Sequence, residues 1–252
     1  MNIIDCSPAS AYGASGIRQL ALRPRLFKTG SAIAEFYLQA YLFAQYHYKQ
    51  LNNEALPCWY QNGVLQSIKA QNKKNPLSAE QLALNYGCNI VDAVSNEEAI
   101  ELAGLCVIGD YLYFPNGGWL DPQALCNSYL SNPNITRNFG TQIESVEPHA
   151  EGWLCKPHRS LDGYYSDLVV LANGINAVNF PQTSALPLSA VRGQATYIKT
   201  NIATAKLNKV VMGERSLFPS FNDQHTVSAS YRRNDSLEYS LQDDKDNIAG
   251  MG

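Results

Sequence analysis

The first residues of the chain combine an acidic side chain with a run of small residues, a pattern that can bind sugar hydroxyls and phosphates. The short apolar stretch Ile3-Ile4 ends in Asp5, and the small residues Gly13-Ala14-Ser15-Gly16 follow. A carboxylate at the end of a strand can accept a hydrogen bond from a ribose hydroxyl, and a loop of small residues lets backbone N–H groups approach a pyrophosphate. The pattern predicts the second half of a βαβ unit that binds a dinucleotide.

The first half of such a unit is a G-x-G-x-x-G turn that opens a helix, and this turn is not found in the sequence. We therefore expect the chain to begin inside the unit, and also to stop before the cofactor-binding domain is closed. Each signal alone has an ordinary structural explanation. Asp5 could simply end an edge strand, and small residues form turns in many proteins.

A third signal is the continuous apolar run Leu168–Leu171, which leads into Ala172-Asn173-Gly174. Such a run is typical of a strand that is covered on both faces. The glycine after it could bring the backbone against a cofactor phosphate, or it could only turn the chain. The three signals together, in this order, favour a fold in which a dinucleotide lies over the carboxyl ends of parallel strands.

Composition excludes several classes of protein. The 252 residues are 45% hydrophobic and 16% charged, which excludes disorder by composition. The net charge of −3 gives no overall field for nucleic acid, and no apolar run approaches the ~20 residues of a membrane helix. The six cysteines form no C-x-x-C pair, and neither they nor the histidines have metal-ligand spacing. We expect no metal, no membrane span, reduced thiols (although an even number also allows disulfides) and a cytoplasmic location.

Hydrophobic periodicity places strands at both ends of the chain and a helix-rich block between them. Helices are expected over 31–51, 78–86, 95–103 and 121–130. A tight hairpin is expected over 59–68, because Asn62-Gly63 tolerates the backbone of a two-residue turn. The polar tail after Asn234 is expected to contain no closing element. The remaining strands are expected over 1–5, 111–114, 135–139, 142–147, 152–156, 168–171, 191–199, 209–212 and 226–231.

Several stretches, in order along nearly the whole chain, resemble the D-amino-acid-oxidase-like FAD superfamily. Within it, they are most similar to the FAD-dependent domain of bifunctional enzymes of tRNA wobble-uridine (5-methylaminomethyl-2-thiouridine) biosynthesis. Two positions depart from the family pattern, namely Leu20, where the family tends to have Gly, and Arg23, where it tends to have Tyr. The stretches that carry the resemblance are Gly13–Gln19, Phe114–Pro122, Val170–Gly174 and Leu186–Gln194, which are similar to G-A-S-G-N-R-Q, P-x-G-G-W-L-x-P, V-x-A-N-G and L-P-x-x-x-V-R-G-Q.

The resemblance implies an α/β fold of mixed α+β type. A Rossmann-like FAD-binding domain would be interleaved with a β-rich substrate domain, and both would be incomplete. Residues 1–30 would be a partial FAD-binding segment and residues 31–133 a helix-rich middle with a hairpin. Residues 134–185 would be a second FAD-binding segment, and residues 186–252 the strands of the substrate domain.

The resemblance also implies which residues meet FAD. Asp5 would hold the adenosine ribose, Ile143 would meet the adenine through its backbone, and Ala172 and Gly174 would pack against the cofactor. The pyrophosphate and flavin side would be lined by Ala14, Ser15, Gly16, Arg18 and Gln19.

The activity implied is an oxidation at a CH–NH group, in which the carboxymethyl group is removed from carboxymethylaminomethyl-(thio)uridine of tRNA and an aminomethyl uridine remains. An S-adenosylmethionine-dependent methyltransferase domain would be the partner in the full-length enzyme. No catalytic acid or base is implied. Arg192 and Gln194 are tentative substrate residues, although Arg192 could equally form a salt bridge at a strand end.

Two other functions remain open at this stage. One is an amine or amino-acid oxidase of the glycine or sarcosine type, and the other is a non-catalytic truncated fragment. A small basic cluster, Arg23, Arg25 and Lys28, could contact RNA phosphates or could be an ordinary solvated face.

Overall fold

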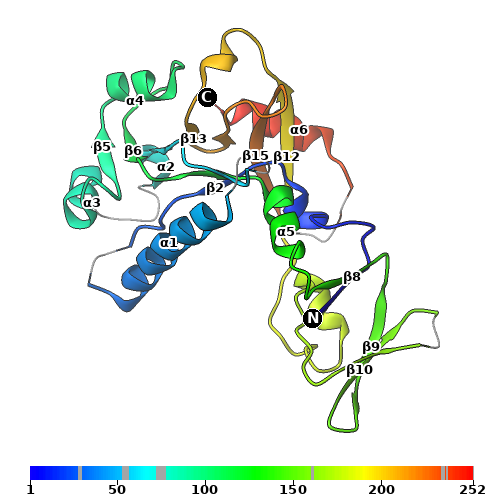
Figure 1. Cartoon of the computed structure of the whole chain (residues 1–252). Helices are drawn as coiled ribbons and strands as arrows, with labels where there is room; N and C mark the ends of the chain where they lie inside the picture. The colour runs from blue at the N-terminus through cyan, green and yellow to red at the C-terminus, as the bar shows by residue number, and fades with distance from the viewer. Residues whose placement is uncertain are drawn as a thin grey trace. The chain divides into compact units, whose positions relative to one another are not determined.

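The structure is a computed structural model that describes residues 1–27, 30–52, 57–71, 78–159, 162–233, 236 and 238–251. It has the mixed α/β fold that the sequence predicts, with several sheets and helices (Figure 1). The chain forms two compact units, each built from separated segments. The first unit comprises residues 1–14, 126–192 and 232–237, and the second comprises residues 15–125, 193–231 and 238–252.

The first unit contains a parallel pair of strands and a small antiparallel sheet. Strand β1 (Asn2–Asp5) pairs in parallel with β8 (Thr136–Phe139), and Asp5 lies opposite Phe139. Strands β9 (Ile143–His149), β10 (Gly152–Pro157) and β11 (Tyr164–Ser166) form the antiparallel sheet. The chain enters this unit within helix α5 (Pro122–Leu130). Its core is built on Val146, Cys155 and Phe180.

The prediction of a doubly covered strand at Leu168–Leu171 is wrong. Val169 and Leu171 pack against the core of the first unit, but Leu168 and Val170 are 75% and 77% exposed. This alternation is that of an extended segment with one covered face. No strand pairs with it, and no backbone hydrogen bond joins Val169–Leu171 to another described residue.

The second unit is built on a seven-stranded mixed sheet in the order β12-β15-β14-β13-β4-β6-β5. A separate three-stranded sheet has the order β2-β7-β3. The main core packs Leu112, Phe114, Trp119 and Phe218 among smaller apolar residues. The strands of the large sheet are β12 (Arg192–Lys199), β15 (Gln224–Arg232), β14 (Ser216–Leu217), β13 (Val210–Met212), β4 (Val64–Ser67), β6 (Tyr111–Phe114) and β5 (Asp92–Val94). The strands of the small sheet are β2 (Leu20–Leu22), β7 (Gly118–Leu120) and β3 (Trp59–Tyr60).

The predicted helices are confirmed, and their ends follow the expected capping chemistry. Ser95 and Glu98 cap each other's backbone N–H groups at the start of α4. Asp121 accepts hydrogen bonds from the N–H groups of Gln123 and Ala124 at the start of α5. The helices of the second unit are α1 (Ala32–Leu51), α2 (Ile68–Gln71), α3 (Ala79–Tyr86), α4 (Asn96–Ala103) and α6 (Leu241–Ala249). None of the described helices is long and apolar enough to cross a membrane.

The predicted hairpin over 59–68 is wrong, although its turn exists. Gly63 has φ +88° and the chain bends there, but β3 pairs with β7 and β4 pairs with β6 and β13. The two strands therefore belong to different sheets. The reason is burial, since Trp59, Val64 and Leu65 are all buried and each strand gains more by joining a larger core than by pairing locally.

The prediction that no element closes the tail is also wrong, because α6 forms there. Ser240 caps this helix by accepting a hydrogen bond from the N–H of Asp243. Asp244 accepts hydrogen bonds from Gln194 and Thr196 of β12, and Asn247 donates to both residues. A polar face rather than an apolar one attaches α6 to the sheet, so hydrophobic periodicity gave no sign of it.

Candidate cofactor-binding site

Asp5 has the position and the free oxygen that a ribose-binding carboxylate needs. It is exposed and lies at the carboxyl end of β1, beside the carboxyl end of β8. Its Oδ1 accepts a hydrogen bond from the N–H of Ser7 at 2.7 Å, which holds the carboxylate in place. Its Oδ2 accepts from no described residue. The second oxygen is therefore open to a ligand hydroxyl.

Backbone hydrogen bonds bring the region of Ile143 to Asp5. After β8 the chain turns at Gly140, and the N–H of Thr141 donates to the carbonyl of Asp5 at 2.9 Å. Ile143 then begins β9, with its side chain in the same core as Val169 and Leu171. Asp5, Ile143 and the segment that leads into Ala172 thus lie in one region of the first unit.

The two predicted glycine-containing bends leave open space where a side chain would project. Gly13 and Gly174 both have φ +60°, and a Cβ added at either would meet no atom within 4 Å. Ala172 and Gly174 are exposed, and Gly174 begins a 3₁₀ turn, Gly174–Asn179. Backbone at these bends is accessible to a ligand, as binding of a dinucleotide phosphate requires. In the first unit, the residues present fit the adenosine half of FAD.

The predicted residues after Ala14 belong to the second unit, where two of their side chains are already engaged. Gln19 is buried, donates to the carbonyl of Pro219 at 3.0 Å and accepts from Thr226 Oγ1 at 2.7 Å. The Arg18 guanidinium lies 4.7 Å from the centre of the Tyr197 ring and donates to Gln224. These contacts anchor the loop of Ser15 and Gly16 to β12 and β15. Gln19 as a whole residue is only 1% exposed, and its role in cofactor binding remains a prediction.

Gln194 is held within the structure in the same way. Its side chain donates to the carbonyl of Ser240 and to Asp244, both at 2.8 Å, and accepts from the N–H of Ser240 at 2.9 Å. The side chain therefore attaches α6 to β12. Arg192 is partly buried at the start of β12 and belongs to the first unit. The substrate roles of both residues remain predictions.

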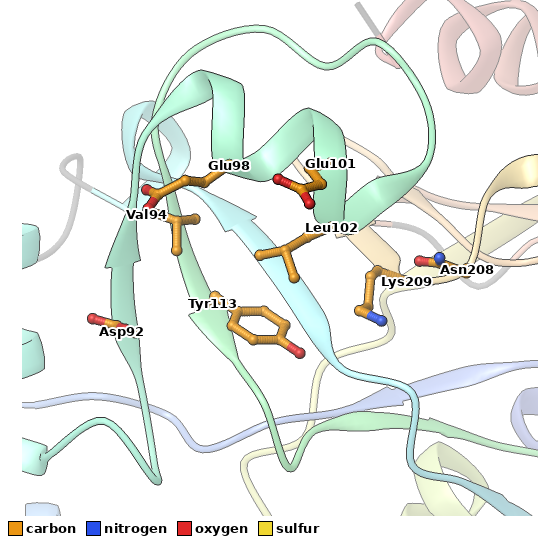
Figure 2. Close-up of a pocket in the computed structure, with 8 residues that line it drawn as sticks. All are labelled: Asp92, Val94, Glu98, Glu101, Leu102, Tyr113, Asn208 and Lys209. Carbon is orange, nitrogen blue, oxygen red and sulfur yellow. The ribbon is translucent and has the colours of Figure 1, made fainter.

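A pocket of about 500 Å³ lies in the second unit, and none of the predicted site residues lines it (Figure 2). Glu98 and Glu101 of α4 line it, with Glu98 turned back toward the start of its helix, whereas Tyr113 comes from β6 and Lys209 from the segment before β13. Burial raises the pKa of Tyr113 and lowers that of Lys209. With Asp92 the lining holds three carboxylates against one ammonium, so this pocket repels the phosphates of a nucleic acid.

Sequence reasoning missed the residues that position the Gly13–Gln19 loop. Thr226 and Gln224 lie more than two hundred positions away in the chain, as the separations of 207 and 206 show. Alternation in β15 indicated which residues share a face but not which loop they meet. In the part of the chain that the structure describes, no group of three or more His, Cys, Asp or Glu side chains could hold a metal ion.

A family model for "FAD dependent oxidoreductase" (DAO) matches residues 3–248. A "tRNA 5-methylaminomethyl-2-thiouridine biosynthesis bifunctional protein MnmC" of Shewanella denitrificans is 32% identical over 240 residues, which are 87% of this chain and 32% of that protein. The protein of the same name from Legionella pneumophila is 28% identical, over 100% of this chain and 37% of its own length. The chain therefore spans about a third of the curated relatives that it matches.

Solved structures show the same fold. Glycine oxidase from Geobacillus kaustophilus superposes with a TM-score of 0.74 at 14% identity, covering 99% of this chain and 69% of that enzyme. A thermally stable mutant of fructosyl peptide oxidase superposes with a TM-score of 0.68 at 17% identity, covering 91% of this chain and 57% of that one. At these identities the likeness concerns architecture alone.

Proposed function

The chain belongs to the FAD-dependent oxidoreductase family, and we propose that it is the flavin-binding part of an enzyme that modifies the wobble uridine of tRNA. In this proposal the substrate is carboxymethylaminomethyl-(thio)uridine, and the product is the aminomethyl uridine. The methyltransferase domain of the longer relatives would act on that product.

One observation carries the proposal. Relatives with 28–32% identity over 87–100% of this chain all bear a name from tRNA 5-methylaminomethyl-2-thiouridine biosynthesis. The amino-acid and amine oxidases found by structure are no more than 19% identical, so they support the fold and not a substrate.

In this proposal, different residues would contact different parts of FAD. The free oxygen of Asp5 would accept a hydrogen bond from the adenosine ribose, and the backbone near Ile143 would meet the adenine. The exposed backbone at Ala172 and Gly174 would lie against the cofactor. Ser15 and Gly16 would offer N–H groups to the pyrophosphate, held in place by the anchoring contacts of Arg18 and Gln19.

FAD, when bound, supplies the removal of a hydride from the carbon between the secondary amine and the carboxylate. That hydride would pass to FAD and the amine proton to water, which would leave a C=N bond in the substrate. Water then adds and splits it into the aminomethyl uridine and glyoxylate. No described side chain is needed as a nucleophile.

The test is incubation of the protein and FAD with tRNA that carries carboxymethylaminomethyl-uridine, followed by nucleoside digestion and mass spectrometry. We expect aminomethyl-uridine and an equal amount of glyoxylate. The same protein is assayed with glycine and N-methylglycine for hydrogen peroxide. Turnover of the free amino acids with unchanged tRNA would replace the proposal by an amino-acid oxidase, and turnover of neither by a non-catalytic fragment.

A further inference from the structure

Helix α1 has two apolar faces, although a helix on the surface of a protein usually has one. Its inner face is centred on Ala34, Tyr41 and Tyr48, which follow one another at intervals of seven residues and are buried or partly buried. Tyr48 packs against buried residues of β3 and β7. Gln45 donates a hydrogen bond to the carbonyl of Asn116. These contacts attach α1 to the second unit (Figure 1).

The opposite face of α1 is exposed and also apolar. Residues that alternate four and three positions apart form one stripe along a helix, and here all six members of the stripe are exposed. We call this stripe the outer seam, and it consists of Ala32, Phe36, Gln39, Phe43, Tyr46 and Gln50. Its three aromatic side chains are 67%, 67% and 68% exposed. Aromatic rings contribute strongly to the energetics of interfaces, so the outer seam is suited to a protein partner.

The helix carries one carboxylate and one ammonium group, and their positions suit a second copy of the same helix. Glu35 lies in the first turn and Lys49 in the last, and both are exposed. Their separation of 14 positions is about four turns, or roughly 21 Å, so both lie on the same flank of the outer seam but cannot pair within one helix. Neither forms an ion pair with another described residue. In an antiparallel pair of such helices, Glu35 of each copy lies beside Lys49 of the other.

We propose that the outer seam of α1 is a self-association surface, on which a second copy of this chain docks its own α1 in the antiparallel direction about a two-fold axis. Phe36 of each copy then meets Tyr46 of the other, and Phe43 meets Gln39. The two ion pairs flank these contacts, and the opposed helix dipoles favour the same direction. A parallel pair would bring like charges together at both ends. The inference goes beyond the proposed function and does not depend on it.

The apolar area on this face is sufficient for a weak but specific dimer. The three aromatic side chains of the outer seam, with the neighbouring Ile33 and Leu42 that are 50% and 38% exposed, offer roughly 500 Å² from each copy. Two copies therefore bury about 1,000 Å², the size at which specific interfaces begin. Phe43 already stacks on His47 of its own helix, with ring centres 5.6 Å apart, so its ring loses little freedom on docking. We expect a Kd in the micromolar range.

Sedimentation equilibrium of the 252-residue protein, from about 1 to 100 μM, measures the association. We expect a monomer–dimer equilibrium, and Phe43→Glu should raise its Kd roughly tenfold or more. Ile202→Glu is the matched control, because it adds the same charge at an apolar residue of the second unit that is 92% exposed, and it should dimerise as the parent does. Since Phe43 is exposed, the dilute monomers of both variants should melt with the parent.

Charge reversal tests the antiparallel arrangement. Glu35→Lys would set two ammonium groups of opposite copies side by side, and Lys49→Glu two carboxylates, so each single variant should dimerise several-fold more weakly than the parent. The double variant Glu35→Lys/Lys49→Glu forms both ion pairs again with the charges exchanged, and it should dimerise more tightly than either single variant. Circular dichroism checks that α1 stays helical, because each exchanged charge lies at the less favourable end of the helix dipole.

Three results would each overturn the inference. The first is a parent protein that stays monomeric over the whole concentration range, which would leave another domain of a longer chain as the cover of this face. The second is an association that Phe43→Glu weakens no more than Ile202→Glu does, which would place the contact on another surface. The third is a double charge variant that dimerises no more tightly than the single variants, which would exclude the antiparallel arrangement.

Discussion

At the scale of single residues, the Asp5 carboxylate is oriented by one hydrogen bond and still has an oxygen that can accept another. One oxygen accepts the Ser7 N–H, and the other accepts from no described residue. A charged acceptor that is already oriented loses little freedom when a ribose hydroxyl binds. The carboxylate therefore contributes to affinity mainly through its charge and its fixed direction.

Asp5→Asn separates these two contributions. The amide oxygen can still accept from Ser7, but the charge-assisted bond to the ribose is lost, which is worth about 1.5–3 kcal/mol. We expect FAD affinity, measured by flavin fluorescence quenching, to fall roughly tenfold or more. Glu151→Gln, an exposed substitution in the same unit, is the control. Equal affinity in Asp5→Asn and the parent would remove Asp5 from the cofactor site.

The sequence was sufficient to nominate Asp5 and Ile143 but not to show that they are neighbours. Their proximity depends on the parallel register of β1 with β8 and on the bond from Thr141 to Asp5, between residues more than 130 positions apart. No local pattern encodes that register. The same holds for Gln19, whose partners Pro219 and Thr226 lie 200 and 207 positions away in the chain.

At the scale of elements, local patterns predicted most of the helices and strands, and the errors fall where an element depends on a distant partner. The capping residues Ser95, Glu98 and Asp121 act within a few positions, so the starts of α4 and α5 were readable. The extended segment Leu168–Leu171 depends on a neighbour for its second face, and no described strand supplies one. Helix α6 was missed because polar contacts rather than an apolar stripe attach it.

That polar attachment of α6 predicts an acid-sensitive element. Burial opposes ionisation of Asp244, but the hydrogen bonds from Thr196, Tyr239 and Gln194 outweigh it, so its pKa lies below the usual 3.8. A lowered folded-state pKa stabilises the fold above the unfolded-state value, and this stabilisation is lost as the pH falls through the folded-state value. We expect α6 to detach below about pH 4.

Limited proteolysis by pepsin across this pH range measures the detachment. Cleavage near α6 should rise below pH 4 in the parent protein and should be high and less dependent on pH in Asp244→Asn. Asp92→Asn, a substitution on β5, should retain the parent profile. If Asp244→Asn had the same dependence of cleavage on pH as the parent, the attachment of α6 would not depend on the charge of Asp244.

At the scale of the whole molecule, the two units have separate cores, one around Phe180 and one around Phe114. Among the residues that the structure describes, the core of the first unit contains three that are buried, and the main core of the second contains ten. Less buried apolar area means less stabilisation against heat. We therefore expect calorimetry to resolve two transitions, the first from the unit that contains Phe180.

Matched substitutions assign the two transitions. Phe180→Ala should lower the free energy of unfolding of the first unit by about 3–5 kcal/mol and leave the temperature of the second transition unchanged. Phe114→Ala should destabilise the second unit by a similar amount and leave the first transition unchanged. FAD should raise the first transition, because ligand that binds only folded protein stabilises it. A single transition that both substitutions shift equally would show one cooperative unit instead.

The backbone of Val169–Leu171 pairs with no described strand, and we expect this to affect how the purified protein behaves. Amide and carbonyl groups that lack a ladder partner can serve as a template on which another polypeptide adds as a strand. We expect concentrated solutions to form oligomers, and ultimately to precipitate, through this edge. A lysine at position 170, where the side chain already projects into water, would discourage that assembly without disturbing the interior.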